Sequence, residues 1–150
     1  MYDSIAKGYD RLHKEEQLEK LEIIKEYFKP KGVLLDLGCG TGIAMDFFDV
    51  DSIGIDPCIE LLKLGKGKRV CGFAERLPFK DNSFGSVICL TAVHHMDVDK
   101  VIKEVKRVCK GEVCFSVLKK SEKCEESTKK LVDAFGLKII EEKKDLILIK

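Results

Sequence analysis

The sequence is short of several residue types, and these shortages indicate what kind of protein it is. Its 150 residues include no Trp, one Asn and one Gln, whereas Lys and Glu are abundant. This composition is typical of thermophile proteins, in which charged side chains are enriched and thermolabile amides are few. The 27 basic and 26 acidic residues nearly cancel, so no net charge of one sign singles out nucleic acid or a membrane as a partner.

Long apolar runs are also lacking. No stretch approaches the ~20 apolar residues that span a bilayer, and the first residues lack the apolar segment of a secretion signal. We therefore expect a cytoplasmic protein without membrane contact, organised as one domain over residues 1–150.

The seven cysteines form no metal-ligand pattern. Their number is odd and no two are arranged as Cys-x-x-Cys, so the sequence predicts neither a disulfide framework nor a zinc site. Four of them lie in apolar runs or in a glycine-rich segment, where Cys acts as a small apolar residue: Cys39, Cys89, Cys109 and Cys114. A reduced, intracellular protein is the natural interpretation.

The most informative segment is residues 33–42, Val-Leu-Leu-Asp-Leu-Gly-Cys-Gly-Thr-Gly. Its apolar residues predict a buried strand that ends at Asp36, and the three glycines predict a loop that leads into a helix. Such a loop lets a ligand approach the backbone and presents free N–H groups to it. No Gly-Lys-Ser/Thr follows, and the spacing differs from Gly-x-Gly-x-x-Gly, so neither a nucleotide-hydrolase loop nor a dinucleotide loop is indicated.

A second acid follows at the end of the next predicted strand. Asp56 closes the strand at residues 52–55, fourteen residues after Gly42. A carboxylate in this place can accept both hydroxyls of a ribose. It can also cap the helix that begins at Pro57, and the two roles are compatible.

Together these segments resemble the class I methyltransferases that use S-adenosylmethionine, in their UbiE-like or type 11 branch. The glycine loop is similar to the first motif of that family, and the similarity continues through residues 2–10, 72–84, 87–95 and 101–110. The resemblance implies an α/β fold with a doubly wound, Rossmann-like sheet of seven strands in the order 3-2-1-4-5-7-6. This sheet is mostly parallel, with an antiparallel strand near the C-terminus.

The resemblance also assigns roles to individual positions. S-adenosylmethionine is the implied cofactor, with the glycine loop around its methionine end and Asp56 on its ribose. Ala74 is implied to offer its backbone N–H to the adenine, whereas Phe73, where many relatives have Asp, packs on the adenine or lies in the core. The implied cofactor-binding residues are Asp36, Gly38, Cys39, Gly40, Gly42, Asp56, Ala74, Glu75 and Leu90.

Apolar spacing predicts two N-terminal helices, at about 3–13 and 15–28. They form a helical cap, residues 1–29, that the resemblance implies is a partial lid over the cofactor. The core, residues 30–150, is predicted to have strands at 33–36, 52–55, 69–73, 85–90 and 112–118, and helices at 42–48, 58–64, 97–109 and 122–135.

Two further strand-like runs, residues 137–142 and 146–150, close the sequence. Only three residues join them, too few for a crossover helix, so these two runs must pair antiparallel.

Methyl transfer needs few catalytic groups, because the methyl group is already activated and is displaced in line. The protein mainly positions cofactor and acceptor, and a general base is required only if the acceptor must lose a proton. His94 and His95 follow the strand at 85–90. Adjacent residues in such a loop point apart, so we expect His95 alone to face the acceptor, with a purely structural role as an equal alternative. Tyr9 is the second catalytic candidate.

Connections in the predicted core are short, and residues 119–121 hold no insertion that could cover a substrate. We therefore expect either a macromolecular acceptor, RNA or protein, or a partner protein that completes the site. Residues 69–73 are predicted as an edge strand, which can pair with another chain, and some family members dock a small zinc-binding activator there.

Three hypotheses follow for the function. The first is an active methyltransferase that uses S-adenosylmethionine. The second is a cofactor-binding subunit of the same fold that is non-catalytic or depends on a partner. The least favoured is a nicotinamide-dependent oxidoreductase, because the glycine spacing differs and no substrate domain is evident.

Overall fold

The computed structural model describes the backbone of residues 2–150 and the side chains of residues 11–150. Seven strands form one sheet in the order β3-β2-β1-β4-β5-β7-β6, as predicted. The strands are β1 (Leu34–Leu37), β2 (Ser52–Asp56), β3 (Lys68–Cys71), β4 (Phe84–Leu90), β5 (Cys109–Leu118), β6 (Lys138–Glu141) and β7 (Asp145–Ile149). β1 to β5 pair in parallel, and β7 runs antiparallel to both β5 and β6.

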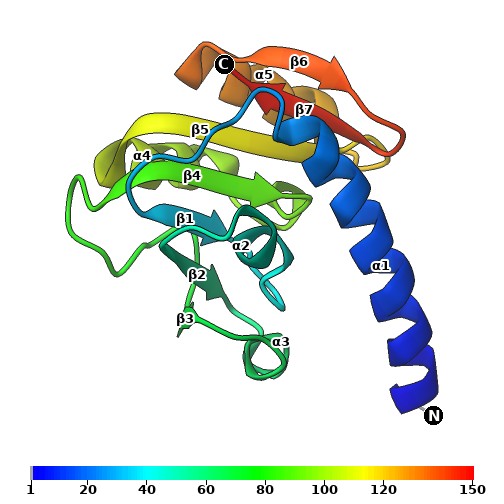
Figure 1. Cartoon of the computed structure of the whole chain (residues 1–150). Helices are drawn as coiled ribbons and strands as arrows, with labels where there is room; N and C mark the ends of the chain where they lie inside the picture. Colours follow the sequence, from blue (N-terminus) through cyan, green and yellow to red (C-terminus); the bar gives the residue numbers. More distant parts are fainter. Residues whose placement is uncertain (1) are drawn as a thin grey trace.

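Helices cover both faces of this sheet (Figure 1). They are α1 (Tyr2–Ile24), α2 (Ile43–Phe48), α3 (Ile59–Lys63), the 3-10 turn η1 (Val93–His95), α4 (Val98–Val108) and α5 (Cys124–Phe135). The end of α1 packs on one face, where Leu21 and Ile24 belong to the same apolar cluster as Ile88 and Ile147. On the other face, the apolar residues of α4 recur every three or four positions and pack with α5 on β4 and β5.

The N-terminal region differs from the prediction. A single helix, α1, replaces the two that we expected and runs through residues 13–15. No Pro or Gly interrupts that stretch, and Lys and Glu favour helix, so nothing in the sequence ends the first helix there. α1 stops at Ile24, four residues before the predicted end.

Two strand boundaries differ from the prediction by more than one residue. β3 ends at Cys71 rather than at residue 73, and Phe73 lies in the following loop with 62% of its surface exposed. The prediction that Phe73 could lie in the core is therefore wrong. β5 begins at Cys109, directly after α4, three residues earlier than predicted.

Within the described residues, no helix is both long and apolar enough to cross a membrane.

Candidate functional site

A cavity of about 840 Å³ lies at the C-terminal ends of β1, β2 and β4. The glycine loop after β1 and the loop after β4 contribute to its lining, and α1 runs past this edge of the sheet (Figure 1). Six of the predicted cofactor-binding residues line it: Asp36, Gly38, Cys39, Gly40, Asp56 and Leu90. The strand order reverses between the paired strands β1 and β4, and ligands of doubly wound folds bind at such a reversal.

Backbone contacts fix the glycine loop. Gly38 and Gly40 have φ of 68° and 54°, in the left-handed region that favours glycine. The N–H groups of Gly38 and Cys39 both donate to the carbonyl of Ile55, at 2.8 and 3.1 Å. The N–H of Gly40 donates to Asp56 Oδ2 at 2.9 Å. The loop after β1 is thereby tied to the end of β2, and its shape is set before any ligand binds.

Two buried carboxylates line this end of the cavity. Asp36 is 2% exposed and Asp56 is 8% exposed. Burial, and secondarily the neighbouring Asp56 carboxylate, raise the pKa of Asp36 to about 8, although Arg69 opposes the shift. Asp36 is therefore mostly protonated at neutral pH, and a cation placed beside it would draw the proton off.

Cys39 lies in the same loop. Burial raises the pKa of its thiol to about 12, so the group stays protonated and is not a nucleophile. Cys89, Cys109 and Cys114 are buried as well. The prediction that these four cysteines act as small apolar residues is confirmed.

The other three predicted cofactor-binding residues do not line this cavity. Gly42 precedes α2, and a Cβ on it would lie 2.7 Å from Arg69 Nη2. Ala74 is buried in the apolar core. Glu75 accepts a hydrogen bond from the backbone N–H of Asp97 at 3.1 Å, in front of α4. Their contacts with a cofactor stay predictions.

Both histidines of η1 line the cavity, which differs from our expectation. Their ring centroids lie 3.9 Å apart, so the two side chains lie together instead of pointing apart. His94 is half-buried and His95 is exposed. Burial, and secondarily His95, lower the pKa of His94, so its imidazole is neutral at pH 7. The side chain of Tyr9, the other catalytic candidate, lies outside the described residues.

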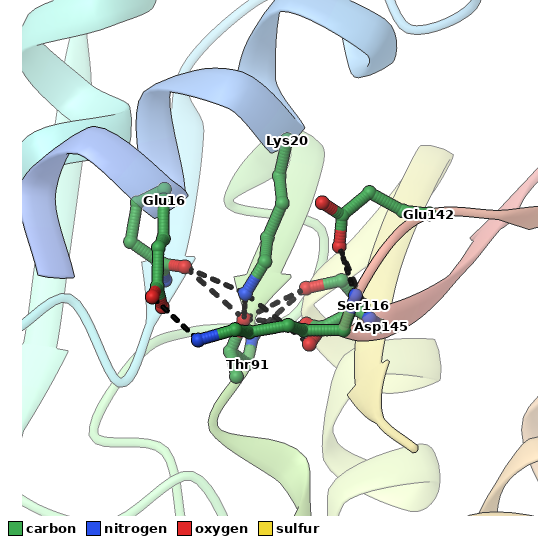
Figure 2. A network of polar contacts seen from close by, with 8 residues as sticks. Glu16, Lys20, Thr91, Ser116, Glu142 and Asp145 are labelled. Carbon is green, nitrogen blue, oxygen red and sulfur yellow. Dashed lines mark hydrogen bonds and ion pairs between the residues drawn. The ribbon is translucent and has the colours of Figure 1, made fainter. Parts of the chain in front are cut away.

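Sequence reasoning missed a buried polar network (Figure 2), two of whose members, Lys20 and Asp145, act electrostatically on His94. Lys20 of α1 and Asp145 at the start of β7 form an ion pair of 3.2 Å, with their side chains 3% and 0% exposed. Thr91, which follows β4, donates through its hydroxyl to Asp145 at 2.6 Å and accepts from Lys20 at 3.0 Å. Gln17 also accepts from Lys20, at 2.9 Å.

This network holds a strained residue. Thr91 has φ of 52°, a value that β-branched residues rarely adopt. Its N–H donates to Ser116 of β5, and its hydroxyl is held by Lys20 and Asp145. Strain of this kind persists only where surrounding contacts impose it, so α1, β5 and β7 together set the start of the loop that carries the histidines. A clue was available in the sequence: Gln17 and Lys20 lie on the apolar face of α1.

Five exposed lysines also line the cavity, and we call them the basic rim: Lys14, Lys119, Lys120, Lys143 and Lys144. They come from α1, from the loop after β5 and from the turn between β6 and β7. The N–H of Lys119 donates to the carbonyl of Lys144 at 2.9 Å, which joins two of these segments. The cavity is thus acidic beside the glycine loop and basic at the rim.

Comparison with known proteins agrees with this geometry. Residues 35–117, more than half of the chain, match the type 11 family described as "Methyltransferase domain". The chain belongs to this family. The matched region of this methyltransferase domain runs from β1 into β5 and includes the glycine loop, Asp56 and both histidines.

Relatives are found among archaeal and animal proteins. The chain is 36% identical over 121 residues to "Uncharacterized protein MJ1252" of Methanocaldococcus jannaschii, covering 76% of this chain and 48% of that protein. It is 28% identical over 117 residues to the bovine "Probable tRNA methyltransferase 9B", covering 72% and 25%. The methyltransferase domain therefore spans about half or less of the length of these curated relatives.

Two solved structures share the fold. An S-adenosylmethionine-dependent methyltransferase of Thermotoga maritima superposes with a TM-score of 0.71 at 18% identity, over 99% of this chain and 91% of that one. A Haloferax volcanii chain in complex with the Trm112 methyltransferase activator superposes with a TM-score of 0.70 at 20% identity, over 91% of this chain and 75% of that one.

Among the described residues of the methyltransferase domain, no group of three or more His, Cys, Asp or Glu side chains is placed to hold a metal ion.

Proposed function

We propose that this protein binds S-adenosylmethionine at the acidic end of the cavity and transfers its methyl group to an acceptor that enters at the basic rim. The observation that carries the proposal is the position of two buried carboxylates, Asp36 and Asp56, around a glycine loop in one cavity. When bound, S-adenosylmethionine supplies a methyl group on a positively charged sulfur. Carboxylates suit its ammonium and sulfonium charges.

The residues present fit this cofactor. The backbone at Gly40 is open, since a Cβ there would meet only Leu61 at 3.8 Å. Asp56 already accepts from the N–H groups of Gly40 and Cys58, and each of its oxygens retains a lone pair for a ribose hydroxyl. Asp36 gains an ionic partner in the ammonium group. We assign Asp56 to the ribose and Asp36 with the glycine loop to the methionine end.

The acceptor side is assigned to the histidines. Neutral His94 can accept a proton, and exposed His95 can orient an acceptor or remove its proton. Tyr9 stays a candidate for the same task. If the acceptor carries no proton to lose, these residues serve only to position it, and proximity supplies most of the acceleration.

A cofactor titration tests the proposal. The protein should bind S-adenosylmethionine and not NAD, as measured by calorimetry. Gly40→Val should weaken binding at least about 100-fold, because a branched side chain is strained at its φ of 54° and would enter the cofactor's space. Gly136→Val is the matched control: φ is 65° and a Cβ meets nothing within 4 Å, so it carries the same backbone strain away from the site. Equal binding by both variants would contradict the proposal.

A partner-dependent subunit is the second candidate, and the β3 edge of the sheet favours it. Three large apolar side chains are exposed around α3 and β3: Ile59, Leu64 and Phe73. An edge strand with exposed apolar neighbours can pair with a strand of another chain. Arg69 of this strand donates to the carbonyls of Leu62 and Thr41, so it connects the edge to the glycine loop. We propose a small activator protein as the occupant, by analogy with the Haloferax volcanii complex.

Two matched variants test this surface. Ile59→Glu places a charge beside β3, and Ile139→Glu places one on β6 at the opposite edge of the sheet, where the side chain is similarly exposed (45% and 51%). After co-expression with the zinc-binding activator of the same genome, Ile59→Glu should lose the complex and Ile139→Glu should keep it, while both still bind S-adenosylmethionine. Without a partner, we expect turnover of free small molecules well below about 1 per second.

A further inference from the structure

The charges around the cavity are unevenly distributed. The acidic end holds Asp36 and Asp56, and among the described residues of the lining Glu16 is the only carboxylate near the rim. Lys144 pairs with Glu16, and Lys143 pairs with Glu19 at 3.4 Å. Within residues 11–150, the structure gives no ion pair to Lys14, Lys119 or Lys120. The rim therefore keeps an excess of positive charge after its internal pairs are counted.

This excess is built by the fold rather than by one lysine-rich stretch. Lys14 comes from α1, Lys119 and Lys120 follow β5, and Lys143 and Lys144 form the turn before β7. The bond between Lys119 N and Lys144 O brings the last two segments together. Like charges gathered around a concave surface repel one another and focus a positive potential, which attracts an anion to the opening.

The cations of the basic rim are all lysines. The lining that the structure describes holds no Arg, the residue whose planar guanidinium binds a carboxylate or a phosphate with two parallel bonds. Lys is a mobile point charge and a common partner of phosphate. Several lysines from separate segments suit the multiple oxygens of phosphate groups better than a single carboxylate.

We propose that the acceptor carries phosphate, which the basic rim binds while the atom to be methylated lies near His94 and His95. This inference rests on the proposed methyltransferase function and names its substrate class. The phosphate belongs either to an RNA backbone or to a small phosphorylated molecule. The two sources differ in size and in the salt dependence of binding, so one set of measurements separates them.

The experiment measures binding and needs no turnover. Labelled single-stranded oligouridine of about 12 nucleotides is titrated with the purified protein at about 50 and about 200 mM salt, and pyrophosphate is titrated separately by calorimetry. Lys119→Ala/Lys120→Ala should weaken binding about tenfold. For RNA it should also lower the slope of log affinity against log salt by about 1.4, at about 0.7 for each lost phosphate contact.

Lys100→Ala/Lys103→Ala is the matched control, because these two exposed lysines lie on α4 and do not line the cavity. It should bind like the unchanged protein. Loss of RNA binding confined to the rim variant supports an RNA acceptor, and loss of pyrophosphate binding alone supports a small phosphorylated acceptor. The proposal is overturned if neither probe binds, or if the two double variants lose binding equally.

A parallel titration with S-adenosylmethionine keeps the two proposals apart. Both double variants should bind it with unchanged affinity, since neither pair touches the acidic end. If phosphate probes fail while S-adenosylmethionine binds, the rim proposal falls and the methyltransferase proposal stands. If S-adenosylmethionine itself fails to bind, the proposed function falls, and the phosphate results still decide whether the rim is an anion site.

Discussion

The acidic end and the basic rim of the cavity are built in different ways. At the acidic end, backbone bonds between neighbouring strands hold Asp56 and the glycine loop, and the two carboxylates are almost completely buried. The basic rim consists of exposed side chains from three distant segments, supported by the buried pair of Lys20 and Asp145. One end is preorganised, and the other can adjust.

This difference suits the two ligands, because the cofactor is always the same molecule whereas acceptors can vary in shape. A fixed loop recognises one cofactor at little entropic cost, because the loop loses no freedom on binding. Flexible lysines can follow acceptors of varied shape, yet they are exposed and screened by salt. Thr91, His94 and His95 all follow β4, and the buried network holds Thr91 at the start of that loop.

The largest expected effect comes from breaking that network. Lys20→Met leaves Asp145 buried without its cation, and loss of one partner of a buried ion pair costs about 3–5 kcal/mol. The free energy of unfolding from urea titration should fall by this amount. Affinity for S-adenosylmethionine, measured where the variant is folded, should change little, because the acidic end does not depend on Lys20.

Lys144→Ala is the control for that measurement. It removes an exposed pair with Glu16 at the same end of the cavity, and pairs of this kind contribute about 0–1 kcal/mol. If both variants lose the same free energy of unfolding, the buried ion pair stabilises the fold no more than the exposed pair does. A fall in cofactor affinity for Lys20→Met would instead show that the two ends are not independent.

The same contrast explains what the sequence could predict. The strand order was implied by the resemblance to the class I methyltransferases. The antiparallel end of the sheet and the acidic end follow from local patterns, such as the three-residue connection near the C-terminus and the acid that closes each of two strands. The network of Lys20, Thr91 and Asp145 joins residues 54 and 71 positions apart. No local pattern encodes such a contact, and periodicity does not indicate the close approach of the two histidine rings in η1.

The next effect concerns the pH dependence of cofactor binding. Burial, then Asp56, raise the pKa of Asp36 to about 8 in the free protein. A cationic cofactor prefers the ionised carboxylate, so binding must release the proton at lower pH. Affinity should therefore rise with pH and level off above about 8, and it should be about fiftyfold weaker at pH 6 than at pH 8.

Asp36→Asn tests the assignment, because it removes the titrating group while keeping its shape. Its affinity should be lower at pH 8 and nearly flat between pH 6 and 8. The stability of the free protein gives an independent check. Because the folded-state pKa is raised, the contribution of the neutral carboxyl is complete below about pH 4 and is lost as pH rises toward 8, so the free protein should lose stability over this range and Asp36→Asn should not.

The smallest of the three effects concerns Asp56. Asp56→Ala removes a charged acceptor of ribose hydroxyls, and affinity for S-adenosylmethionine should fall about tenfold or more. The change also frees the N–H groups of Gly40 and Cys58, so a loss by itself does not separate ribose binding from support of the loop.

A deoxy analogue makes that separation. S-adenosylhomocysteine and its 2′-deoxy form should differ in affinity for the unchanged protein. They should bind with equal affinity to Asp56→Ala, because in this variant the 2′-hydroxyl has no carboxylate to bond with. If the two ligands keep the same ratio in both proteins, Asp56 acts only through the glycine loop. The acidic end would then recognise the methionine moiety of the cofactor through Asp36, and the ribose would be held elsewhere.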